Sequence, residues 1–415
     1  MCSRRWPATG AVFLLLISIV LLTILLHKER NDEEMQSHGS IPTSNRSHAL
    51  QPPGCHELTR FDRPRWPLPF ADPTFRELCA AKSIVGARGR CFRLKQRGVK
   101  CLPSFLVIGF TKSGTSVFFQ YASQHTLVRT ARIKEPAYFG SDMEFYNGTE
   151  DARNVPPVKT LRWYMNLFPA SPACERGEAT PSYAWRDFAA TAATQARLLL
   201  GGDAKLLMLV REPIERAASH YLYFRDKRRA FRNANLSYAL TSALDEFERC
   251  IAQLKGWRHQ CTYRAGRRQV EIAAAAIQRT KPELWRLKNK ASYELLQAGL
   301  YSEHLRTWRA QFGAKNMLVI DMALLLSKPL RAMRRFERHL GLPQMGGYET
   351  SLEHALSSPR LEHGGPVPGA GASAALTQHV DRQLRLRLET FFAPFNRKLK
   401  KASGVGWTYS STRRR

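Results

Sequence analysis

The sequence predicts an α/β protein with a central parallel sheet and helices on both faces, preceded by one transmembrane helix. Short apolar runs alternate with helical stretches through most of the chain, which is typical of a parallel sheet. A 19-residue uncharged run, residues 8–26, lies near the N-terminus. The 64 Lys and Arg against 34 Asp and Glu give a net charge of +30, which indicates a polyanionic partner. The 44% hydrophobic content excludes a globally disordered chain.

The run 8–26 is about long enough to cross a bilayer as a helix. A cleaved signal peptide is the alternative, but this run continues directly into the charged His27–Arg30, without a small-residue cleavage site. Arg4 and Arg5 precede it, which favours a cytosolic tail 1–7 and a luminal body. We therefore expect a single-pass type II membrane protein. A luminal body also disfavours nucleic acid as the polyanion.

Glycosylation triplets and cysteines agree with a luminal body. Acceptor triplets begin at Asn45, Asn147 and Asn235, although such triplets also occur by chance. All cysteines except Cys2 would lie in an oxidising space, and their odd number leaves at least one unpaired or paired between chains. Cys250 and Cys261 flank a Gly-containing basic loop and are our candidate disulfide, with two reduced thiols as the alternative.

The organisation along the chain follows from composition. Pro-rich residues 27–100 predict a stem, and residues 101–415 predict the globular body. We expect strands over 105–110, 204–210 and 317–321. We expect helices over 115–124, 214–224, 303–312 and 377–390. Irregular, basic residues of about 225–290 predict an insertion, and 364–371 a flexible loop.

The first predicted strand leads into a turn that suits a phosphate. Its residues are Lys112, Ser113, Gly114, Thr115 and Ser116. Backbone N–H groups and a helix N-terminus would face an anion, and lysine and hydroxyl donors would assist. An ATP-type loop needs lysine directly after the second glycine, where this chain has Thr115. The pattern therefore favours a nucleotide without a triphosphate tail, and an ordinary strand–helix turn is the alternative.

A second turn repeats this layout after residue 210. Arg211 ends the strand, Pro213 suits a first helical turn, and Ser219 follows two turns later. The guanidinium and the hydroxyl could bind one phosphate together. A solvated arginine at a helix start is the alternative. Two such turns in one sheet, however, are less expected by chance than one.

These residues resemble a known family, the membrane-anchored, Golgi-type carbohydrate sulfotransferases. The Lys112–Ser116 turn resembles their 5′-phosphosulfate loop, and Arg211 with Ser219 resembles their 3′-phosphate motif. The chain looks closest to the N-acetylgalactosamine 4-sulfate 6-O-sulfotransferases of chondroitin sulfate. Segments that carry this likeness over about residues 100–410 are 101–105, 133–136, 177–179, 248–250, 261–263, 299–301, 394–396 and Trp407. One departure is Thr111, where the family usually has proline.

The resemblance implies roles for individual residues. Glu135, in Lys134-Glu135-Pro136, would be the general base, and Lys112 would stabilise charge on the leaving group. The donor would be 3′-phosphoadenosine 5′-phosphosulfate (PAPS), and no metal is expected. Tyr301 and Arg360 would join both turns in binding it, although Tyr301 could also be a core residue. Lys134 and Glu178 would position the acceptor or the base. Three arginines of the basic insertion, Arg264, Arg267 and Arg268, would bind the polymeric acceptor, with a solvated basic face as the alternative. His220 could compete as the base, although we expect it to pack beside Ser219.

We therefore expect a PAPS-dependent carbohydrate O-sulfotransferase of the Golgi membrane with a luminal catalytic domain. The expected acceptor is the 6-hydroxyl of N-acetylgalactosamine 4-sulfate in chondroitin or dermatan sulfate. Heparan sulfate is the alternative, because its 3-O-sulfotransferases share the Lys-Glu-Pro segment. A glycosyltransferase and a non-catalytic heparin-binding membrane protein are further alternatives. The first usually needs an Asp-x-Asp motif, which is lacking here, and the second has no need of two phosphate turns.

Overall fold

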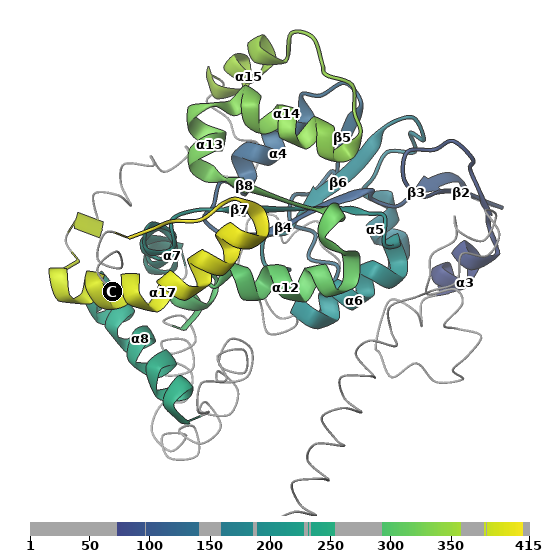
Figure 1. Cartoon of the computed structure of the whole chain (residues 1–415). Coiled ribbons are helices and arrows are strands. Elements are labelled where there is room, and N and C mark those ends of the chain that lie inside the picture. The colour runs from purple at the N-terminus through teal and green to yellow at the C-terminus, as the bar shows by residue number, and fades with distance from the viewer. Residues whose placement is uncertain are drawn as a thin grey trace, which may run out of the picture. The chain divides into compact units, whose positions relative to one another are not determined.

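The computed structural model describes residues 73–95, 97–140, 159–185, 189–227, 231, 234–253, 293–357, 377–378 and 380–409. The chain divides into the units Met1–Ala49 and Leu50–Arg415, and every described residue belongs to the second unit. Figure 1 shows its central sheet between helices.

The central sheet is parallel, as the sequence predicted. Its order is β5 (Val128–Thr130), β6 (Glu175–Ala179), β4 (Phe105–Gly109), β7 (Lys205–Val210), β8 (Met317–Asp321). The earliest strand of this sheet, β4, lies in the middle, so the next two strands lie on one side of it and the last two on the other. Ligands of open α/β sheets bind outside the carboxyl ends of strands at such a reversal point.

Alternating side chains of β4 and β7 build a core on each face of the sheet. Leu106, Ile108 and Met208 face α6 (Ala189–Leu200) and α12 (Tyr301–Phe312), as their shared cluster with Trp308 shows. Phe105 and Val107 pack in a separate cluster with helices of the opposite face. Those helices are α4 (Thr115–Ser123), α13 (Met322–Ser327), α14 (Pro329–Leu340) and α15 (Tyr348–Ser357). The predicted α/β class with helices on both faces is therefore confirmed.

A third cluster joins α7 (Pro213–Lys227), α8 (Leu236–Gln253) and α17 (Arg382–Ser403). The sequence interpretation treated α8 as part of an irregular insertion, and this was wrong for residues 236–253. Its apolar positions follow the helical period, at Leu236, Leu240, Leu244 and Phe247, and all are buried. The last helix was expected over 377–390, but α17 starts after Asp381, whose carboxylate accepts the Leu384 amide.

The folded body starts earlier than the predicted stem boundary. Helix α3 (Pro73–Ala80) precedes an antiparallel sheet of β1 (Lys82–Ser83), β2 (Cys91–Leu94) and β3 (Gly98–Cys101). Phe75 and Phe92 are fully buried in the same cluster as the central sheet, and a disulfide joins Cys91 to Cys101. Strands this short fall below what hydrophobic periodicity can detect, so the sequence interpretation placed them in the stem.

The remaining elements of the described residues are one short helix, one 3₁₀ turn and two strands that the sequence interpretation did not predict. Helix α5 (Leu161–Asn166) packs against β3, and a 3₁₀ turn (Ala314–Asn316) precedes β8. The sequence interpretation missed β5 and β6, although it found β4, β7 and β8 to within one residue at each end. Strand β6 reads Glu-Arg-Gly-Glu-Ala, which has no apolar run, yet all of its residues are buried.

Several predictions concern residues outside the described part of the chain. These are the anchor 8–26, Asn45, Asn147, Arg264, Arg267, Arg268, Cys261, Arg360 and the loop 364–371, as well as the side chain of Cys250. Among the helices that are described, none is both long and apolar enough to cross a membrane.

Candidate active site

The turn after β4 has the backbone geometry of an anion cradle. Lys112 and Gly114 have positive φ angles of 69° and 84°, and Gly114 occupies the N-cap position of α4 without a side-chain cap. A Cβ on Gly114 would lie 3.2 Å from Cγ of Met322, so both conformation and space favour glycine there. Uncapped amide groups at this helix start can donate to an anion.

The departure at Thr111 gives this turn a side-chain contact. The indole Nε1 of Trp185 donates to the Thr111 hydroxyl over 3.3 Å. Trp185 is buried in the turn that follows β6, so the bond ties the β4 turn to its neighbour.

Arg211 leaves β7 at the same edge of the sheet. Its guanidinium is largely buried and bonds Oε2 of Glu215, one helical turn along α7, at 3.1 Å. The Tyr301 hydroxyl donates to the Arg211 carbonyl at 2.8 Å and accepts its amide N–H at 3.3 Å. Tyr301 itself is only 1% exposed and packs on the Phe110 ring. It therefore supports the Arg211 backbone as a core tyrosine, and its predicted contact with the nucleotide stays a prediction.

Glu135 lies beyond β5, at this edge as well. Its side chain is 45% exposed and contacts the ammonium of Lys134, which is 8% exposed. Both Glu135 and Ala137 have positive φ angles, of 62° and 46°, which is unusual for residues other than glycine. A carboxylate that reaches solvent from a fixed loop is suited to proton abstraction.

The two turns and Glu135 lie within electrostatic reach of each other. Burial lowers the pKa of the Lys112 ammonium, the positive charge of Arg211 lowers it further, and the Glu135 carboxylate raises it. The Lys112 ammonium also lies over the Tyr223 ring of α7, 5.3 Å from its centre. Three segments that are distant in sequence therefore converge on one site.

The side chain of Glu178 is buried and does not reach the surface of this site. The residue is fully buried in β6, and its carboxylate accepts hydroxyl protons from Thr180, Tyr183 and Tyr164 at 2.7, 2.8 and 3.3 Å. Burial raises its pKa to about 7, although the three hydrogen bonds oppose that rise. The predicted contact between Glu178 and the acceptor does not fit a side chain without exposed surface.

Comparison with known proteins identifies the family. A model described as "Sulfotransferase domain" matches residues 102–358. The chain belongs to the sulfotransferase family.

The sulfotransferase is similar to several curated relatives at low identity. Mouse heparan sulfate glucosamine 3-O-sulfotransferase 3A1 is 27% identical, over 79% of this chain and 70% of the relative. Human heparan sulfate glucosamine 3-O-sulfotransferase 6 is 25% identical, over 75% of each chain. A solved sulfotransferase from Alicyclobacillus acidocaldarius is 21% identical, covers 72% of this chain and 95% of its own, and has a TM-score of 0.45. The prediction that this chain is a sulfotransferase enzyme is confirmed.

Sulfotransferases use PAPS, and the described residues fit such a donor. The β4 turn offers amide donors, the Lys112 ammonium and the side chains of Thr115 and Ser116, of which Thr115 is buried. Arg211 offers a guanidinium at the neighbouring strand end, and Ser219 is half-exposed on α7. No group of three or more possible metal ligands occurs within the described ranges.

His220 does not fit the role of a competing base. It is 2% exposed, its Nδ1 lies 3.1 Å from the Arg216 guanidinium, and its ring stacks on Phe224. Asn235 is exposed, as a glycosylation site requires, but its side-chain oxygen also accepts the Tyr238 amide and so caps α8.

Sequence reasoning missed Glu212, Tyr409 and the hydroxyls around Glu178. Tyr409 donates to the Glu212 carboxylate, which also accepts the Glu215 amide at the start of α7. The contact joins residues that are nearly two hundred positions apart, so no local pattern indicates it.

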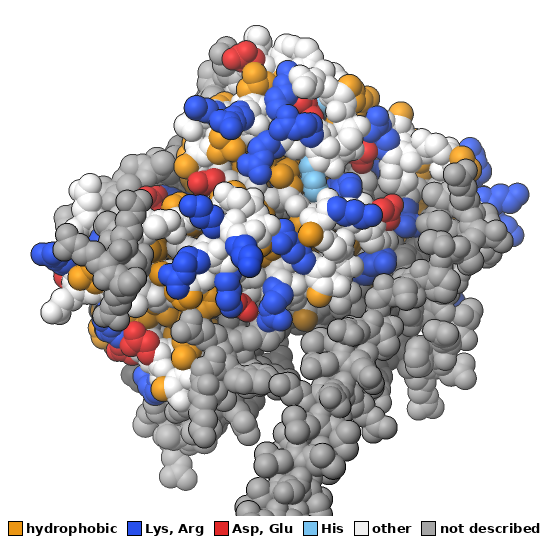
Figure 2. Space-filling view, viewed as in Figure 1, with side chains coloured by type: hydrophobic (Ala, Val, Ile, Leu, Met, Phe, Trp, Pro, Cys, Tyr) orange, Lys and Arg blue, Asp and Glu red, His pale blue; other side chains and the backbone are white. Residues whose placement is uncertain are grey.

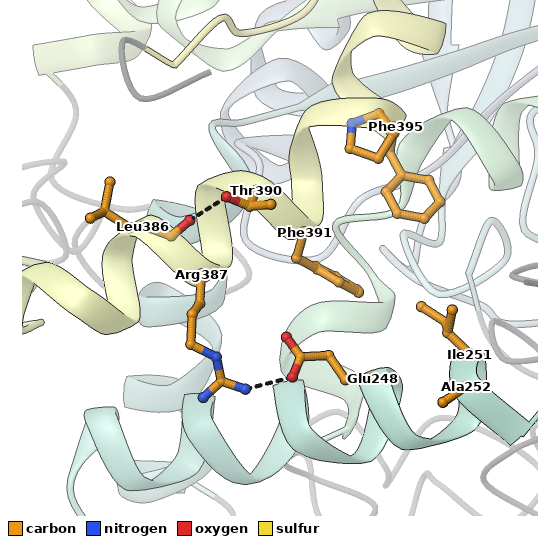
Figure 3. A pocket seen from close by; sticks show the side chains of 9 residues that line it. Glu248, Ile251, Ala252, Leu386, Arg387, Thr390, Phe391 and Phe395 are labelled. Atoms are coloured by element: carbon orange, nitrogen blue, oxygen red, sulfur yellow. Dashed lines mark hydrogen bonds and ion pairs between the residues drawn. The ribbon is translucent and has the colours of Figure 1, made fainter. Parts of the chain in front are cut away.

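A cavity of about 500 Å³ lies elsewhere, between α8 and α17 (Figure 3). Arg387 spans it to Glu248 on the facing helix, and Phe391 and Phe395 line its apolar part. None of the residues that line it belongs to the sheet edge. The candidate active site therefore follows from convergent chemistry at the strand ends, and not from the size of a cavity.

Proposed function

We propose that this sulfotransferase transfers the sulfuryl group of PAPS to a hydroxyl of heparan sulfate, on a glucosamine residue. The observation that carries the proposal is the convergence of Lys112, Arg211 and Glu135 at the carboxyl edge of the sheet. Cationic groups for an anionic donor and a carboxylate for a sugar hydroxyl then lie in one site.

The acceptor in this proposal differs from the one that the sequence favoured. Relatives named as heparan sulfate glucosamine 3-O-sulfotransferases support heparan sulfate over the chondroitin N-acetylgalactosamine acceptor. A further relative, from Drosophila melanogaster, is named as a heparan sulfate N-deacetylase/N-sulfotransferase. The same relatives support the 3-hydroxyl of glucosamine as the group that receives the sulfuryl group.

The surface charge supports a polyanionic acceptor. Figure 2 shows Lys and Arg side chains spread over the face formed by α12 and α14, with few acidic ones among them. On α14, Arg331, Arg335 and Arg338 lie on one side of the helix. Burial lowers the pKa of Arg335, and the nearby charges of Arg338 and Arg331 lower it further. Like charges this close destabilise a helix slightly, so a bound polyanion would relieve their repulsion.

The proposed mechanism assigns a step to each residue. Glu135 takes the proton of the acceptor hydroxyl as that oxygen attacks sulfur, because a sugar hydroxyl is a poor nucleophile. Lys112 and the β4 amides stabilise negative charge where the leaving group departs. Arg211, held by Glu215 and Tyr301, binds and orients a phosphate. When bound, PAPS supplies an activated sulfuryl group.

We also propose a Golgi membrane location, with the catalytic body in the lumen. The uncharged run 8–26 supports an anchor, and the Cys91–Cys101 disulfide suits an oxidising compartment.

The test incubates the full-length chain with radiolabelled PAPS and heparan, chondroitin and dermatan sulfates, followed by disaccharide analysis. We expect label on glucosamine of heparan sulfate. Label on 4,6-disulfated N-acetylgalactosamine would restore the chondroitin acceptor. Absence of label from every acceptor, in a chain that binds adenosine 3′,5′-bisphosphate, would contradict a glycosaminoglycan acceptor.

A further inference from the structure

The loop that carries Glu135 is held by hydroxyl groups. Beyond Pro136, the amide of Ala137 donates to Thr180 Oγ1 at 3.2 Å. The amides of Tyr138 and Phe139 both donate to the Tyr183 hydroxyl, at 2.7 and 3.3 Å. Three consecutive amides are therefore fixed by two side chains from the turn after β6.

A hydroxyl can fix an amide in this way only if its own proton points elsewhere. Thr180 and Tyr183 direct their protons to the two oxygens of Glu178, at 2.7 and 2.8 Å. Each hydroxyl has one proton and two acceptor lone pairs, so a proton directed to Glu178 leaves the oxygen free to accept an amide. The carboxylate thus sets the direction of both hydroxyls.

This support matters because the loop is strained. Positive φ angles at residues other than glycine cost of order 1–3 kcal/mol each. Glu135 and Ala137 have such angles, of 62° and 46°, on either side of Pro136. Hydrogen bonds to Thr180 and Tyr183 act directly after this segment and stabilise the conformation that presents Glu135.

We propose that Glu178 is a positioning residue that, through Thr180 and Tyr183, fixes the loop carrying the base Glu135. This inference rests on the proposed function for the role of Glu135, but not for the hydrogen-bond network itself. Glu178 contacts no reacting atom in this account, and it acts only through the two hydroxyls.

Titration of Glu178 supports a test by pH. Its pKa is raised to about 7 by burial, and the Glu135 carboxylate adds to the rise. Tyr164 from α5 and Tyr183 face it, but both have pKa values well above 10 and stay neutral. Lys159 donates to the Ala137 carbonyl on the far side of the loop. Below pH 7 the protonated carboxyl becomes a donor, so one hydroxyl loses its acceptor.

The experiment measures hydrogen–deuterium exchange and turnover in the full-length chain with Glu178→Gln. Exchange at the amides of residues 137–139 should become about tenfold faster, because about 1.4 kcal/mol of protection is lost. The kcat for sulfuryl transfer to heparan sulfate should fall about 10- to 100-fold, because small displacements of catalytic groups are this costly. Affinity for adenosine 3′,5′-bisphosphate should stay unchanged.

Lowering the pH should speed exchange at residues 137–139 in the wild type between pH 8 and 6, after correction for intrinsic rates. The Glu178→Gln variant should lack this dependence. A purely structural role for Glu178 would change protection across the whole sheet and would not produce this local titration.

Matched variants keep the test decisive. Glu175→Gln changes another buried glutamate of β6, at the opposite end of the strand, and should leave kcat and loop exchange unchanged. If Glu178→Gln does not fold, Thr180→Val removes one of the two hydroxyls, and Thr180→Ser should restore kcat.

Unchanged exchange at residues 137–139, or unchanged kcat in a folded variant, would overturn the positioning role. If the wild type transfers sulfuryl normally in that case, the proposed function stands. If the wild type transfers none, the proposed function fails, and the exchange measurement still decides whether Glu178 fixes the loop.

Discussion

The charged groups on the two sides of β4 differ in the partners that fix them. On the β7 side, the site presents cations, and Arg211 is held by the carboxylate of Glu215 and the hydroxyl of Tyr301. On the β6 side, Glu178 is held by neutral hydroxyls. A group that must bind an anion tolerates a partial counter-charge. Burial raises the pKa of the Glu178 carboxylate to about 7, so this group can change its charge near neutral pH.

On the cationic side, the largest expected effect is that of changing Lys112. Lys112→Ala should lower kcat about 10²- to 10³-fold, because it removes a preorganised charge from the site of the leaving group. Steady-state kinetics with heparan sulfate measure this loss. Lys205→Ala is the control, because Lys205 begins β7 at the opposite edge and bonds Asn316. Equal losses in both variants would mean that the lysine supports the sheet instead of the chemistry.

On the β6 side, the expected effect is a pH dependence of the free energy of unfolding that Glu178 causes. The folded pKa of Glu178 is raised from 4.5 to about 7, so unfolding releases a proton between these pH values. Wild-type stability should therefore fall, as pH rises from 4.5 to 7, by up to about 3 kcal/mol relative to Glu178→Gln. Denaturant unfolding at pH 5 and pH 8 measures the change. A constant difference between the two proteins would show that Glu178 keeps an ordinary pKa.

Arg211→Ala should weaken the binding of adenosine 3′,5′-bisphosphate about 10- to 100-fold, because a charge-assisted hydrogen bond contributes about 1.5–3 kcal/mol. Arg211→Lys should recover only part of the affinity, since lysine lacks the planar fork. Titration calorimetry gives both values. Arg306→Ala, an exposed arginine of α12, serves as the control. Wild-type affinity in Arg211→Ala would remove the phosphate role from the β7 turn.

Tyr301→Phe should have the smallest effect. It deletes the hydroxyl that bonds the Arg211 backbone and keeps the ring on Phe110. Loss of about 1 kcal/mol should weaken nucleotide binding about fivefold and leave kcat nearly unchanged. The same calorimetry applies. A loss as large as that of Arg211→Ala would instead indicate direct nucleotide contact, as the sequence suggested.

The functional residues on the β7 side of β4 were easier to predict from the sequence than those on the β6 side. The β4 and β7 turns follow apolar strands directly, so Lys112 and Arg211 could be assigned from local pattern alone. Glu178 lies in β6, which has no apolar run, and its partners Tyr164 and Tyr183 come from other elements. The base loop could be named only from a family resemblance, and its support depends on packing that no local pattern encodes.

The fold shows the same limit. Central strands with continuous apolar runs were predicted almost to the residue, and the short strands β1, β2 and β3 were not. These strands depend on a disulfide and on burial of Phe92 against the main core. Such stabilisation is tertiary, so periodicity along the chain does not reveal it.

The most direct test of the account compares wild type with Glu135→Gln in sulfuryl transfer and nucleotide binding. We predict that the wild type transfers radiolabel from PAPS to heparan sulfate. Glu135→Gln should bind adenosine 3′,5′-bisphosphate with wild-type affinity but lose about 10²- to 10⁴-fold in kcat, the range of general base catalysis. Retained turnover in a folded Glu135→Gln chain would contradict the assignment of the active site to this edge of the sheet.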